Sequence, residues 1–586
     1  MLKLLTTLLA TSMVASASPA ALRPRDGCSI TWNGTAITGT MDGAACRYTI
    51  RYGTAKRWEY PVAATNQSGQ DAANFPSMCP QPVADELESA LSTPAAQSED
   101  CLFTTIYTPV GSNSTDLPVF VWHHGGDYVE GSESDKGLNG SALASESSMI
   151  VAVMQYRVGL LGFVPPSVAP TSADPNFGLR DAILHLEVIR DNVAAVGGNS
   201  SRVTVGGQSA GASLIRTMWG APAAQGLFHG MIIQSDPMNF GTQSAADEAG
   251  LQTLAFTNAT LTGNCTTFEC FQNISITDMM TIETYVISKA FANVTGVPIG
   301  ETFRPQYYTE SLPHDPFNSL FNNASNLAIN LTTVPIMITS IKNESGYLIE
   351  EFFSSATAGN EALYDYALQS LFGDERAAIV NASGLYPVIN GTDGLRQALE
   401  IVVTDAAWRC VTRETARRLA GAGATVYLGE WLEGIRYTFG NGSYCTQDGV
   451  WCHGTDVYPT FSDGPAGSNT TFETLVRNYW TSFITTGSPA SDAQPWTAFT
   501  ANGTDADVHA IGDGPMATCP ADFWGTKVQW DWMLYSSNET GTIGSATTSS
   551  ATTATSKSAG TVNTVKVPFI GVAVAIAAVG CGALLV

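Results

Sequence analysis

The 586-residue chain has few charged side chains, and few of those are positive. Only 13% of the residues are charged, and 27 Lys and Arg stand against 52 Asp and Glu, which leaves a formal net charge of −25. A nucleic-acid-binding protein needs basic patches to neutralise phosphates, so this composition argues against that class of partner. The acidity indicates a well-solvated surface, and it weakly favours neutral or cationic substrates.

Histidines and metal-binding motifs are also scarce. The chain holds seven histidines and no Cys-x-x-Cys pair or histidine cluster that would indicate a zinc site. We find no internal repeat. Apolar residues make up 44% of the sequence, which is enough for a large core, and one large domain is the simplest partition.

The N-terminus carries a targeting signal. Lys3 precedes an apolar run, and Ala15-Ser16-Ala17 offers a small-residue cleavage site. This order is typical of a secretory signal peptide over residues 1–17. We therefore expect a secreted, extracellular protein whose folded domain spans residues 18–539.

The C-terminus carries a second signal. Residues 540–566 form a spacer rich in Ser and Thr, and residues 567–586 form an uncharged apolar tail. This order predicts a glycosylphosphatidylinositol (GPI) anchor, with Ser556 and Ser558 as candidate attachment residues; a terminal transmembrane helix is the competing interpretation. We expect the anchor to be the protein's membrane contact and to hold it at the cell surface.

An oxidising compartment favours disulfides. Eleven cysteines are present, and Cys581 lies in the removable tail, so ten remain. The sequence does not prove their connectivity, but pairing nearest neighbours predicts five disulfides: Cys28–Cys46, Cys79–Cys101, Cys265–Cys270, Cys445–Cys452 and the remaining Cys410–Cys519.

Secretion also predicts glycans on Asn-x-Ser/Thr sequons. The sequons include Asn33, Asn66, Asn113, Asn139, Asn258, Asn502 and Asn538. Asn343 lies in a further sequon, but it stands beside a candidate catalytic residue, so we expect it to stay unmodified.

Strand-like and helix-like runs alternate from about residue 100 to 235. Apolar strands are predicted at residues 117–122, 149–154, 203–205 and 230–234, and apolar residues recur at helical spacing over 178–196. Buried strands that alternate with helices predict an α/β fold with a mostly parallel central sheet and helices on both faces. The C-terminal half is richer in helices and loops, and we expect it to insert between the later strands and cover the site.

The pentapeptide Gly207-Gln208-Ser209-Ala210-Gly211 follows one of these strands and leads into a run that can begin a helix. A Gly-x-Ser-x-Gly in that context predicts a nucleophile elbow, a turn so tight that the neighbours of the serine must be small. The pattern alone is weak because these residues are common. Ser209 is a candidate nucleophile if the chain also supplies its partners.

A serine hydroxyl is a poor nucleophile and needs a base, oriented by a carboxylate, within hydrogen-bond reach. The two candidate bases downstream of Ser209 are His453 and His509. His453 adjoins Gly454 in a loop that the predicted Cys445–Cys452 pair would close, whereas His509 lies in an alternating polar segment. A constrained loop suits a catalytic base better, so we favour His453.

The orienting acid is expected between Ser209 and His453. Glu344 follows a strand-like run at residues 334–339, and chemistry in parallel sheets gathers at the carboxyl ends of strands. Glu350 and Glu351 are alternatives, but they fall in the next helix-like run and are expected to face solvent.

These residues together resemble the type B carboxylesterase and lipase family, which includes the cholinesterases and a group of fungal lipases. With its predicted secretion signals, the chain resembles the secreted fungal members. Further matching motifs follow in the family's order over residues 51–523: Ser98-Glu99-Asp100-Cys101-Leu102 with Ile106-Tyr107-Thr108-Pro109, Tyr156-Arg157, Gly162-Phe163, Asn176-Phe177-Gly178-Leu179-Arg180-Asp181 and Gly197-Gly198.

The resemblance implies an α/β-hydrolase fold and hydrolysis of small-molecule carboxylic esters without a cofactor. It implies that Ser209 is the nucleophile, Glu344 the acid and His453 the base of the triad. It also supports three of the predicted disulfides, Cys79–Cys101, Cys265–Cys270 and Cys410–Cys519.

The segment His123-His124-Gly125-Gly126-Asp127-Tyr128 occupies the place of the family's oxyanion loop, which usually has three glycines. Here Asp127 stands third. Its backbone N–H can still donate, so we predict oxyanion donors at Gly126, Asp127 and Ala210, with Gly125 shaping the turn. The Asp127 carboxylate would oppose an oxyanion unless it points away or is paired.

Two further departures concern the pocket. Gln208 precedes the nucleophile where many members have Glu, which removes an anionic group from the pocket floor. The 79–101 loop has no aromatic residue for a cation–π contact, which argues against a choline ester as the preferred substrate. One helical face of this loop carries Val83, Ala84, Leu87, Ala90 and Leu91, and the loop is short, so we expect a small rim helix there rather than the lid of the related lipases.

A cell-surface adhesion or binding protein is the alternative function, because some relatives keep this fold and have lost the nucleophile. The intact residues Ser209, Glu344 and His453 favour an enzyme. The sequence leaves acyl-chain preference, the natural ester and the oligomeric state open.

Overall fold

The structure is a computed structural model, and it describes residues 27–65, 67, 72–82, 96–112, 114–435, 444–461, 468–490 and 495–535. The predicted signal peptide, the spacer and the apolar tail lie outside the described residues, as does the predicted rim helix at 83–95. Within the described ranges, no helix is both long enough and apolar enough to cross a bilayer.

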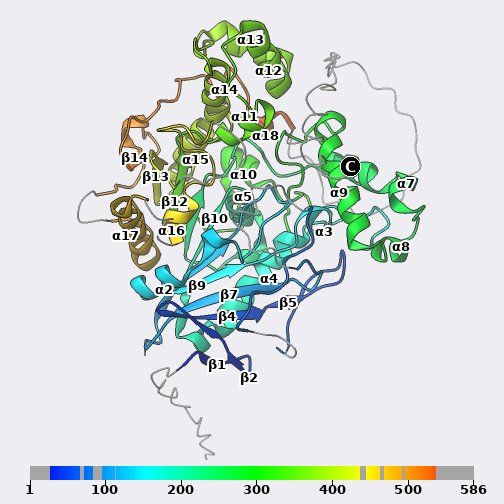
Figure 1. The fold of residues 1–586 in the computed structure, drawn as a ribbon, viewed down its shortest axis with the longest axis vertical. Helices are drawn as coiled ribbons and strands as arrows, with labels where there is room; N and C mark the ends of the chain where they lie inside the picture. The colour runs from blue at the N-terminus through cyan, green and yellow to red at the C-terminus, as the bar shows by residue number, and fades with distance from the viewer. Residues whose placement is uncertain are drawn as a thin grey trace, which may run out of the picture.

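A ten-stranded sheet runs through the molecule in the order β14-β13-β12-β11-β10-β8-β9-β7-β4-β3 (Figure 1). The pairings from β14 to β9 are parallel, and those that add β7, β4 and β3 are antiparallel. The predicted mostly parallel sheet is therefore confirmed. The strands are β3 (Thr40–Asp42), β4 (Ala45–Arg51), β7 (Phe103–Pro109), β8 (Leu117–His123), β9 (Ile150–Met154), β10 (Gly198–Gln208), β11 (Gly230–Gln234), β12 (Ile336–Ile341), β13 (Val426–Trp431) and β14 (His509–Ile511).

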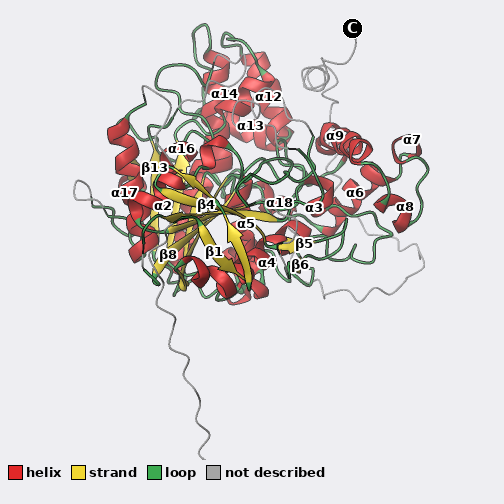
Figure 2. Cartoon of the chain, turned by 60° about the horizontal axis from the view of Figure 1, so that its bottom comes forward, coloured by secondary structure: helices red, strands yellow, loops and turns green. Residues whose placement is uncertain are grey.

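Helices cover both faces of the sheet, as Figure 2 shows. On one face, alternate strand residues such as Val121 and Val205 share a core with α4 (Phe177–Asn192), α5 (Ala210–Thr217) and α15 (Cys410–Gly421). On the other face, residues such as Phe120 and Trp122 pack with α2 (Ser141–Ser147), α16 (Val457–Phe461) and α17 (Thr470–Thr486). Strands buried on both faces must be apolar throughout, which is why the sequence showed runs and not alternation.

The two largest differences from prediction concern strand β10 and the helix at 178–196, and the other predicted strands differ by at most two residues at an end. Strand β10 is longer than the predicted 203–205, because its polar segment 199–202 continues the strand through an irregular register beside β8. The predicted helix at 178–196 divides into α4 and a 3₁₀ turn, η2 (Val193–Val196), which ends where Gly197 takes a left-handed φ of 84°. The spacing of apolar residues could not predict either difference, because it detects neither a strand made of polar residues nor a change from α-helix to 3₁₀ helix.

Two helical insertions follow the later strands, and Figure 1 shows α7–α9 of the first at the right and α12–α14 of the second at the top. The second corresponds to the helical insertion predicted for the C-terminal half, whereas the first lies mostly before that half and was not predicted. The first, between β11 and β12, contains α6 (Ala245–Phe256), α7 (Ala259–Thr262), α8 (Phe268–Gln272), α9 (Ile276–Asn293) and α10 (Pro316–Asn322). The second, between β12 and β13, contains α11 (Gly346–Phe352), α12 (Glu361–Phe372), α13 (Asp374–Ser383), α14 (Gly394–Thr404), the π-helical turn η6 (Asp405–Arg409) and α15.

Five disulfides have the expected pairing: Cys28–Cys46, Cys79–Cys101, Cys265–Cys270, Cys410–Cys519 and Cys445–Cys452. The Cys410–Cys519 bond ties the start of α15 to the segment after β14. The Cys445–Cys452 bond closes the loop that precedes His453. Both therefore restrain segments around the carboxyl ends of the strands.

Candidate active site

Ser209 forms the turn between β10 and α5. Its backbone has φ 57° and ψ −126°, a region that a residue with a side chain rarely occupies and that marks stored strain. A Cβ at Gly207 would lie 2.6 Å from the carbonyl carbon of Gly211, and one at Gly211 would lie 2.1 Å from the carbonyl oxygen of His123. The turn therefore requires both glycines, as a nucleophile elbow does.

Glu344 lies in the turn after β12, fully buried. Its Oε1 accepts a hydrogen bond from the backbone N–H of Ile341 at 2.7 Å, and its Oε2 lies 2.6 Å from Nδ1 of His453. A carboxylate in this place holds the proton of the neutral imidazole on Nδ1 and leaves Nε2 with the lone pair. The structure thus brings together the predicted acid and the predicted base.

The imidazole of His453 packs against two aromatic rings, Tyr347 at 5.2 Å and Trp408 at 5.5 Å between ring centroids. Burial alone would lower the pKa of His453. The hydrogen bond and charge of Glu344, with the charges of Asp456 and Asp127, outweigh burial and raise that pKa above its ordinary value. His453 therefore stays protonated to a higher pH than a free histidine does.

The Nε2 atom of His453 is engaged by Gln208, whose Nε2 lies 3.0 Å away. Since Nδ1 carries the proton toward Glu344, the Gln208 amide donates and His453 Nε2 accepts. Among the hydrogen bonds of the described residues, none joins Ser209 Oγ to His453. Gln208 thus occupies the lone pair that the predicted mechanism assigns to the serine proton, and His453 would have to leave this amide to act on Ser209.

If His453 is the base of the predicted ester hydrolysis, replacing Gln208 by glutamate should shift the pH dependence of that reaction. A carboxylate at this position favours the imidazolium form of His453, so the neutral base becomes scarce at low pH. Gln208→Glu should lose about tenfold in kcat/KM at pH 5.5 relative to the wild type and approach it above pH 8. A pH–rate profile of both proteins, measured on one chromogenic ester, checks this; parallel profiles would contradict it.

The predicted oxyanion loop follows β8 and touches the elbow. A Cβ at Gly125 would lie 2.9 Å from the carbonyl oxygen of Gln208, so only glycine permits this approach. Gly126 and Asp127 have left-handed φ values of 103° and 51°. The described residues provide no hydrogen-bond acceptor for the backbone N–H groups of Gly126 and Asp127. These two donors are therefore available to a ligand beside Ser209.

Tyr156 packs against the predicted oxyanion loop through His124. Its hydroxyl donates to the carbonyl oxygen of His124 at 2.9 Å, and its ring stacks on the His124 imidazole with 4.4 Å between centroids. Arg157, the next residue, forms a buried ion pair with Asp181 at 2.7 Å. The motifs that the sequence singled out upstream of the elbow thus position the oxyanion loop and anchor it to α4.

Asp127 and Ser209 line one small cavity. Its other lining residues are Pro237, Phe240, Ile299, Gly300, Glu301, Tyr347, Leu348 and Trp408. Burial raises the pKa of Asp127 to about 6, although the charge of His453 lowers it. Among the described residues, no side chain or backbone group hydrogen-bonds the Asp127 carboxylate, so it is not paired in the way that would remove its effect on an oxyanion.

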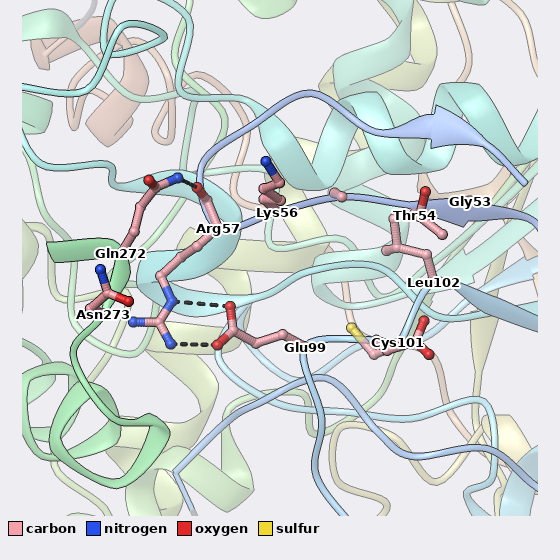
Figure 3. Close-up of a pocket in the computed structure, with 11 residues that line it drawn as sticks. Gly53, Thr54, Lys56, Arg57, Glu99, Cys101, Leu102, Gln272 and Asn273 are labelled. Atoms are coloured by element: carbon pink, nitrogen blue, oxygen red, sulfur yellow. Dashed lines mark hydrogen bonds and ion pairs between the residues drawn. The ribbon is translucent and has the colours of Figure 1, made fainter. Parts of the chain in front are cut away.

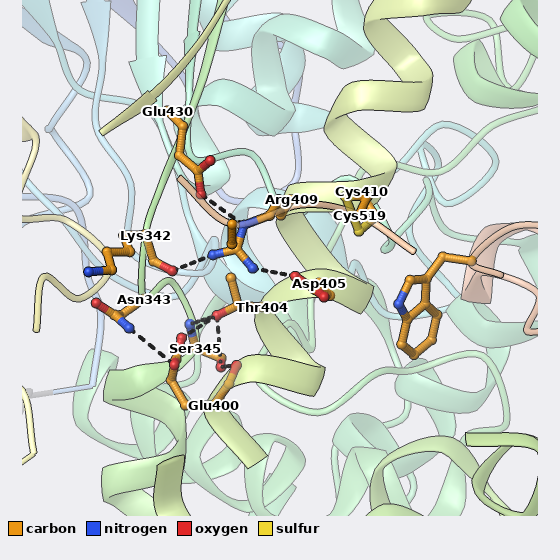
Figure 4. A network of polar contacts seen from close by, with 12 residues as sticks. Lys342, Asn343, Ser345, Glu400, Thr404, Asp405, Arg409, Cys410, Glu430 and Cys519 are labelled. Atoms are coloured by element: carbon orange, nitrogen blue, oxygen red, sulfur yellow. Dashed lines mark hydrogen bonds and ion pairs between the residues drawn. A yellow bond between two sulfur atoms is a disulfide. The ribbon is translucent and has the colours of Figure 1, made fainter. Parts of the chain in front are cut away.

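A buried polar network behind Glu344 holds its turn in place (Figure 4). The Arg409 guanidinium pairs with Asp405, donates to Glu430 Oε1 at 2.8 Å and donates to the carbonyl oxygen of Lys342 at 2.6 Å. Ser345 is fixed from the other side, since its N–H and its hydroxyl bond to α14 at 3.0 and 2.9 Å. The residues that flank Glu344 are therefore fixed by α14, η6 and β13.

Asn343 connects the Glu344 turn to the His453 loop. Its Oδ1 accepts from the N–H of Trp451 at 3.1 Å, and its Nδ2 donates to Glu400 Oε2 at 3.1 Å. Burial raises the pKa of Glu400 to about 7. A glycan on Nδ2 would displace this bond and enter a packed region.

Peptide mass spectrometry of the secreted protein should therefore find Asn343 without a glycan. The exposed sequons at Asn33 and Asn502 serve as internal comparisons, and we expect glycans on them. Modified Asn343 peptides from active enzyme would contradict the role of this side chain as a bridge.

The competing candidates lie elsewhere or serve other contacts. His509 is in β14, where its Nε2 lies 3.0 Å from the Tyr479 hydroxyl and its ring stacks on Trp496. Glu350 accepts from the N–H of Cys445 at 3.1 Å, and Glu351 is exposed on α11. Neither glutamate contacts His453 in the described structure.

A hollow of about 420 Å³ lies apart from these residues (Figure 3). Arg57 crosses it and binds the Glu99 carboxylate with Nε at 3.0 Å and with a second guanidinium nitrogen. Glu99, which belongs to the family-like motif at residues 98–102, therefore has a structural role as the partner of Arg57. The hollow contains none of the residues predicted for catalysis.

From the sequence alone, we did not identify three residues that lie at or support the candidate site: Asp456, Arg409 and Glu301. Asp456 follows His453 by three residues and raises its pKa; the proximity to His453 was the available signal. Arg409 and Glu301 come from the helical insertions, far along the chain from the elbow, and no motif marked them.

The parallel sheet, the strained serine turn at the end of β10 and the histidine loop after β13 define an α/β-hydrolase. The model of the carboxylesterase family matches residues 41–519. The chain therefore belongs to the carboxylesterase family and is a carboxylic ester hydrolase.

Individual relatives support the assignment to this family, and a solved structure supports the fold. The chain is 27% identical over 449 residues to para-nitrobenzyl esterase of Bacillus subtilis, covering 73% of this chain and 82% of the relative. It is 27% identical over 455 residues to carboxylesterase 1D of Mus musculus, covering 73% and 77%. A solved thermophilic pNB esterase superposes with a TM-score of 0.64 at 24% identity, covering 80% of this chain and 94% of that one, which supports the fold.

Proposed function

We propose that this protein hydrolyses small-molecule carboxylic esters with Ser209 as nucleophile, His453 as general base and Glu344 as the acid that orients the base. The observation that carries the proposal is the 2.6 Å contact between Glu344 Oε2 and His453 Nδ1, at the same end of the sheet as the strained Ser209 turn. Membership of the carboxylesterase family supports the reaction class.

In the first half of the reaction, Ser209 Oγ attacks the ester carbonyl while His453 Nε2 accepts the serine proton. The imidazole becomes positively charged, and the buried Glu344 carboxylate stabilises that charge. The imidazolium then donates its proton to the alcohol oxygen, the C–O bond breaks, and an acyl-serine remains. A water molecule repeats the sequence and releases the carboxylic acid.

The negative oxygen of each tetrahedral intermediate would accept hydrogen bonds from the backbone N–H groups of Gly126, Asp127 and Ala210. Ala210 is the first residue of α5, so its N–H has no partner within the helix, and the helix N-terminus adds a favourable partial positive charge. Gly125 allows the loop to approach the elbow closely enough for the three donors to converge.

A fluorophosphonate probe tests the assignment, because it forms a stable phosphonyl ester with an activated serine. We expect stoichiometric labelling, loss of hydrolysis of p-nitrophenyl butyrate, and mass-spectrometric recovery of the label on the peptide that holds Ser209. A panel of p-nitrophenyl esters of increasing chain length then defines the acyl preference. Label on another serine, or activity that survives full labelling, would refute the proposal.

We further propose that the enzyme acts outside the cell, secreted by its N-terminal signal and held by a GPI anchor. The order of Ser/Thr-rich spacer and apolar tail supports this. Phosphatidylinositol-specific phospholipase C should release the activity from intact cells; activity that stays membrane-bound would favour a transmembrane tail.

A further inference from the structure

The cavity beside Ser209 contains a carboxyl group that the ester mechanism does not use. Glu301 lines this cavity together with Asp127. Only 1% of Glu301 is exposed, and neither of its carboxylate oxygens has a hydrogen-bond partner among the described residues. Leaving a buried acceptor unsatisfied is costly, so a partner outside the protein is the simplest reason for this arrangement.

The charged groups around Glu301 do not balance. Arg216 is already paired with Asp236 at 2.7 Å. Arg304, the other nearby cation, donates to the carbonyl oxygens of Gly241 and Gly296 at 2.8 and 2.7 Å rather than to a carboxylate. His453 is the counter-charge of Asp127, so when this imidazole is neutral, as a general base must be, two guanidinium groups remain for three carboxyl groups, those of Asp127, Asp236 and Glu301.

Burial keeps the Glu301 carboxyl group neutral at pH 7 when no further cation is present, whereas Asp127, whose pKa is about 6, is mostly ionised there. It raises the pKa of Glu301 to about 8, with the negative charges of Asp127 and Asp236 adding to the effect and Arg304 and Arg216 opposing it. A positive charge bound in the cavity would reverse this balance and favour both carboxylates in their ionised form. The acid pair is thus suited to a ligand that brings its own positive charge.

The rings that line the cavity suit such a ligand once the cavity, about 10 Å³ in volume here, opens to admit it. Trp408, Tyr347 and Phe240 contribute aromatic rings to the same cavity. A cation gains from the faces of such rings, and the hydrocarbon part of the ligand gains from the apolar contact. These three rings come from segments outside the 79–101 loop. The lack of aromatic residues in that loop therefore does not exclude a cation–π contact in this cavity.

We propose that Asp127 and Glu301 form a subsite for a protonated amine, and that the enzyme prefers esters carrying a protonated amine over neutral esters of the same shape. This inference rests on the proposed ester hydrolysis at Ser209 and names the substrate class for that site. Asp127 reaches the cavity from the loop after β8, and Glu301 lines the same cavity from the segment between α9 and α10.

Two matched pairs of esters test the proposal at pH 7. On the acyl side, p-nitrophenyl 6-aminohexanoate is compared with p-nitrophenyl heptanoate, in which a methyl group replaces the ammonium. On the alcohol side, 3-(dimethylamino)propyl butanoate is compared with 4-methylpentyl butanoate by acid release. We expect kcat/KM to favour the amine by about tenfold or more in at least one pair.

The isosteric variant Glu301→Gln should lower that ratio about tenfold, and Asp127→Asn should lower it as well. Glu375→Gln, which removes an exposed carboxylate on α13, serves as the matched control and should keep the wild-type ratio. The ratio separates recognition of charge from a general loss of folded enzyme, because both esters of a pair report on the same preparation.

A wild-type ratio at or below one in both pairs would overturn the inference, as would a ratio that Glu301→Gln leaves unchanged. Failure of the underlying mechanism looks different, since neither ester of a pair would then be hydrolysed through Ser209. Hydrolysis of both esters with a neutral preference would leave the esterase intact and remove only the amine subsite.

Discussion

Ser209→Ala is expected to lower kcat for p-nitrophenyl butyrate by about 10⁴-fold or more and to abolish labelling by a fluorophosphonate. In the proposed mechanism the serine oxygen is the atom that forms the acyl-enzyme, and alanine leaves no group that can replace it. The backbone donors of the oxyanion loop remain, so a small residual rate above the uncatalysed one is expected.

The fold should tolerate this substitution. Ser209 is buried, and alanine is smaller, so the elbow keeps its flanking glycines and its backbone bond from Ser209 N to Gln234 O at 3.0 Å. Ser201→Ala, at an exposed position of β10, is the matched control and should retain full activity. Residual turnover within tenfold of the wild type, in protein with unchanged thermal unfolding, would move the nucleophile elsewhere.

Glu344→Gln is expected to lower kcat by about 10³- to 10⁴-fold without unfolding the protein. The reason lies in the two contacts of this carboxylate. The N–H of Ile341 needs an acceptor, so the glutamine oxygen takes the place of Oε1. Its NH₂ group then faces Nδ1 of His453, which must become the acceptor, and the imidazole proton moves to Nε2.

That tautomer cannot accept a proton from Ser209. Glu350→Gln is the matched control, because Glu350 was the alternative acid and contacts the N–H of Cys445 instead. We expect Glu350→Gln to keep kcat within about threefold of the wild type. A larger loss in Glu350→Gln than in Glu344→Gln would reassign the orienting acid.

The raised pKa of His453 predicts how the rate of ester hydrolysis depends on pH. Glu344, Asp456 and Asp127 raise this pKa, and a general base works only when it is neutral, so activity should fall as the pH drops through this raised pKa. Gln208 is the neutral neighbour in this acidic setting, which is why its replacement by glutamate should move the acid limb of the profile to higher pH.

Much of the fold could be predicted because its signals are local. The strands β8, β9 and β11 are apolar runs, and the elbow is five consecutive residues whose size the turn itself dictates. The disulfide pairs followed from neighbouring cysteines, and the last pair from elimination. The order of the predicted loop, serine, acid and base along the chain was recognised from the resemblance to the family.

The contacts between distant segments could not be predicted. Gln208 was recognised as a neutral substitution, but its bond to His453, 245 residues away, depends on how the loop after β13 folds back. The Arg409 network joins η6, β13 and the turn after β12, and no pattern of residue types encodes that meeting.

By itself, the sequence determined the class of fold, the nucleophile turn and the candidate acid and base, because each depends on residues that are adjacent in the chain or follow a periodic pattern. Only the tertiary structure decided that Gln208 engages the base and that Asp127 shares its cavity with an unpartnered Glu301. Charge balance and hydrogen-bond satisfaction are sums over everything that packs around a group, and packing brings together residues that the sequence keeps apart.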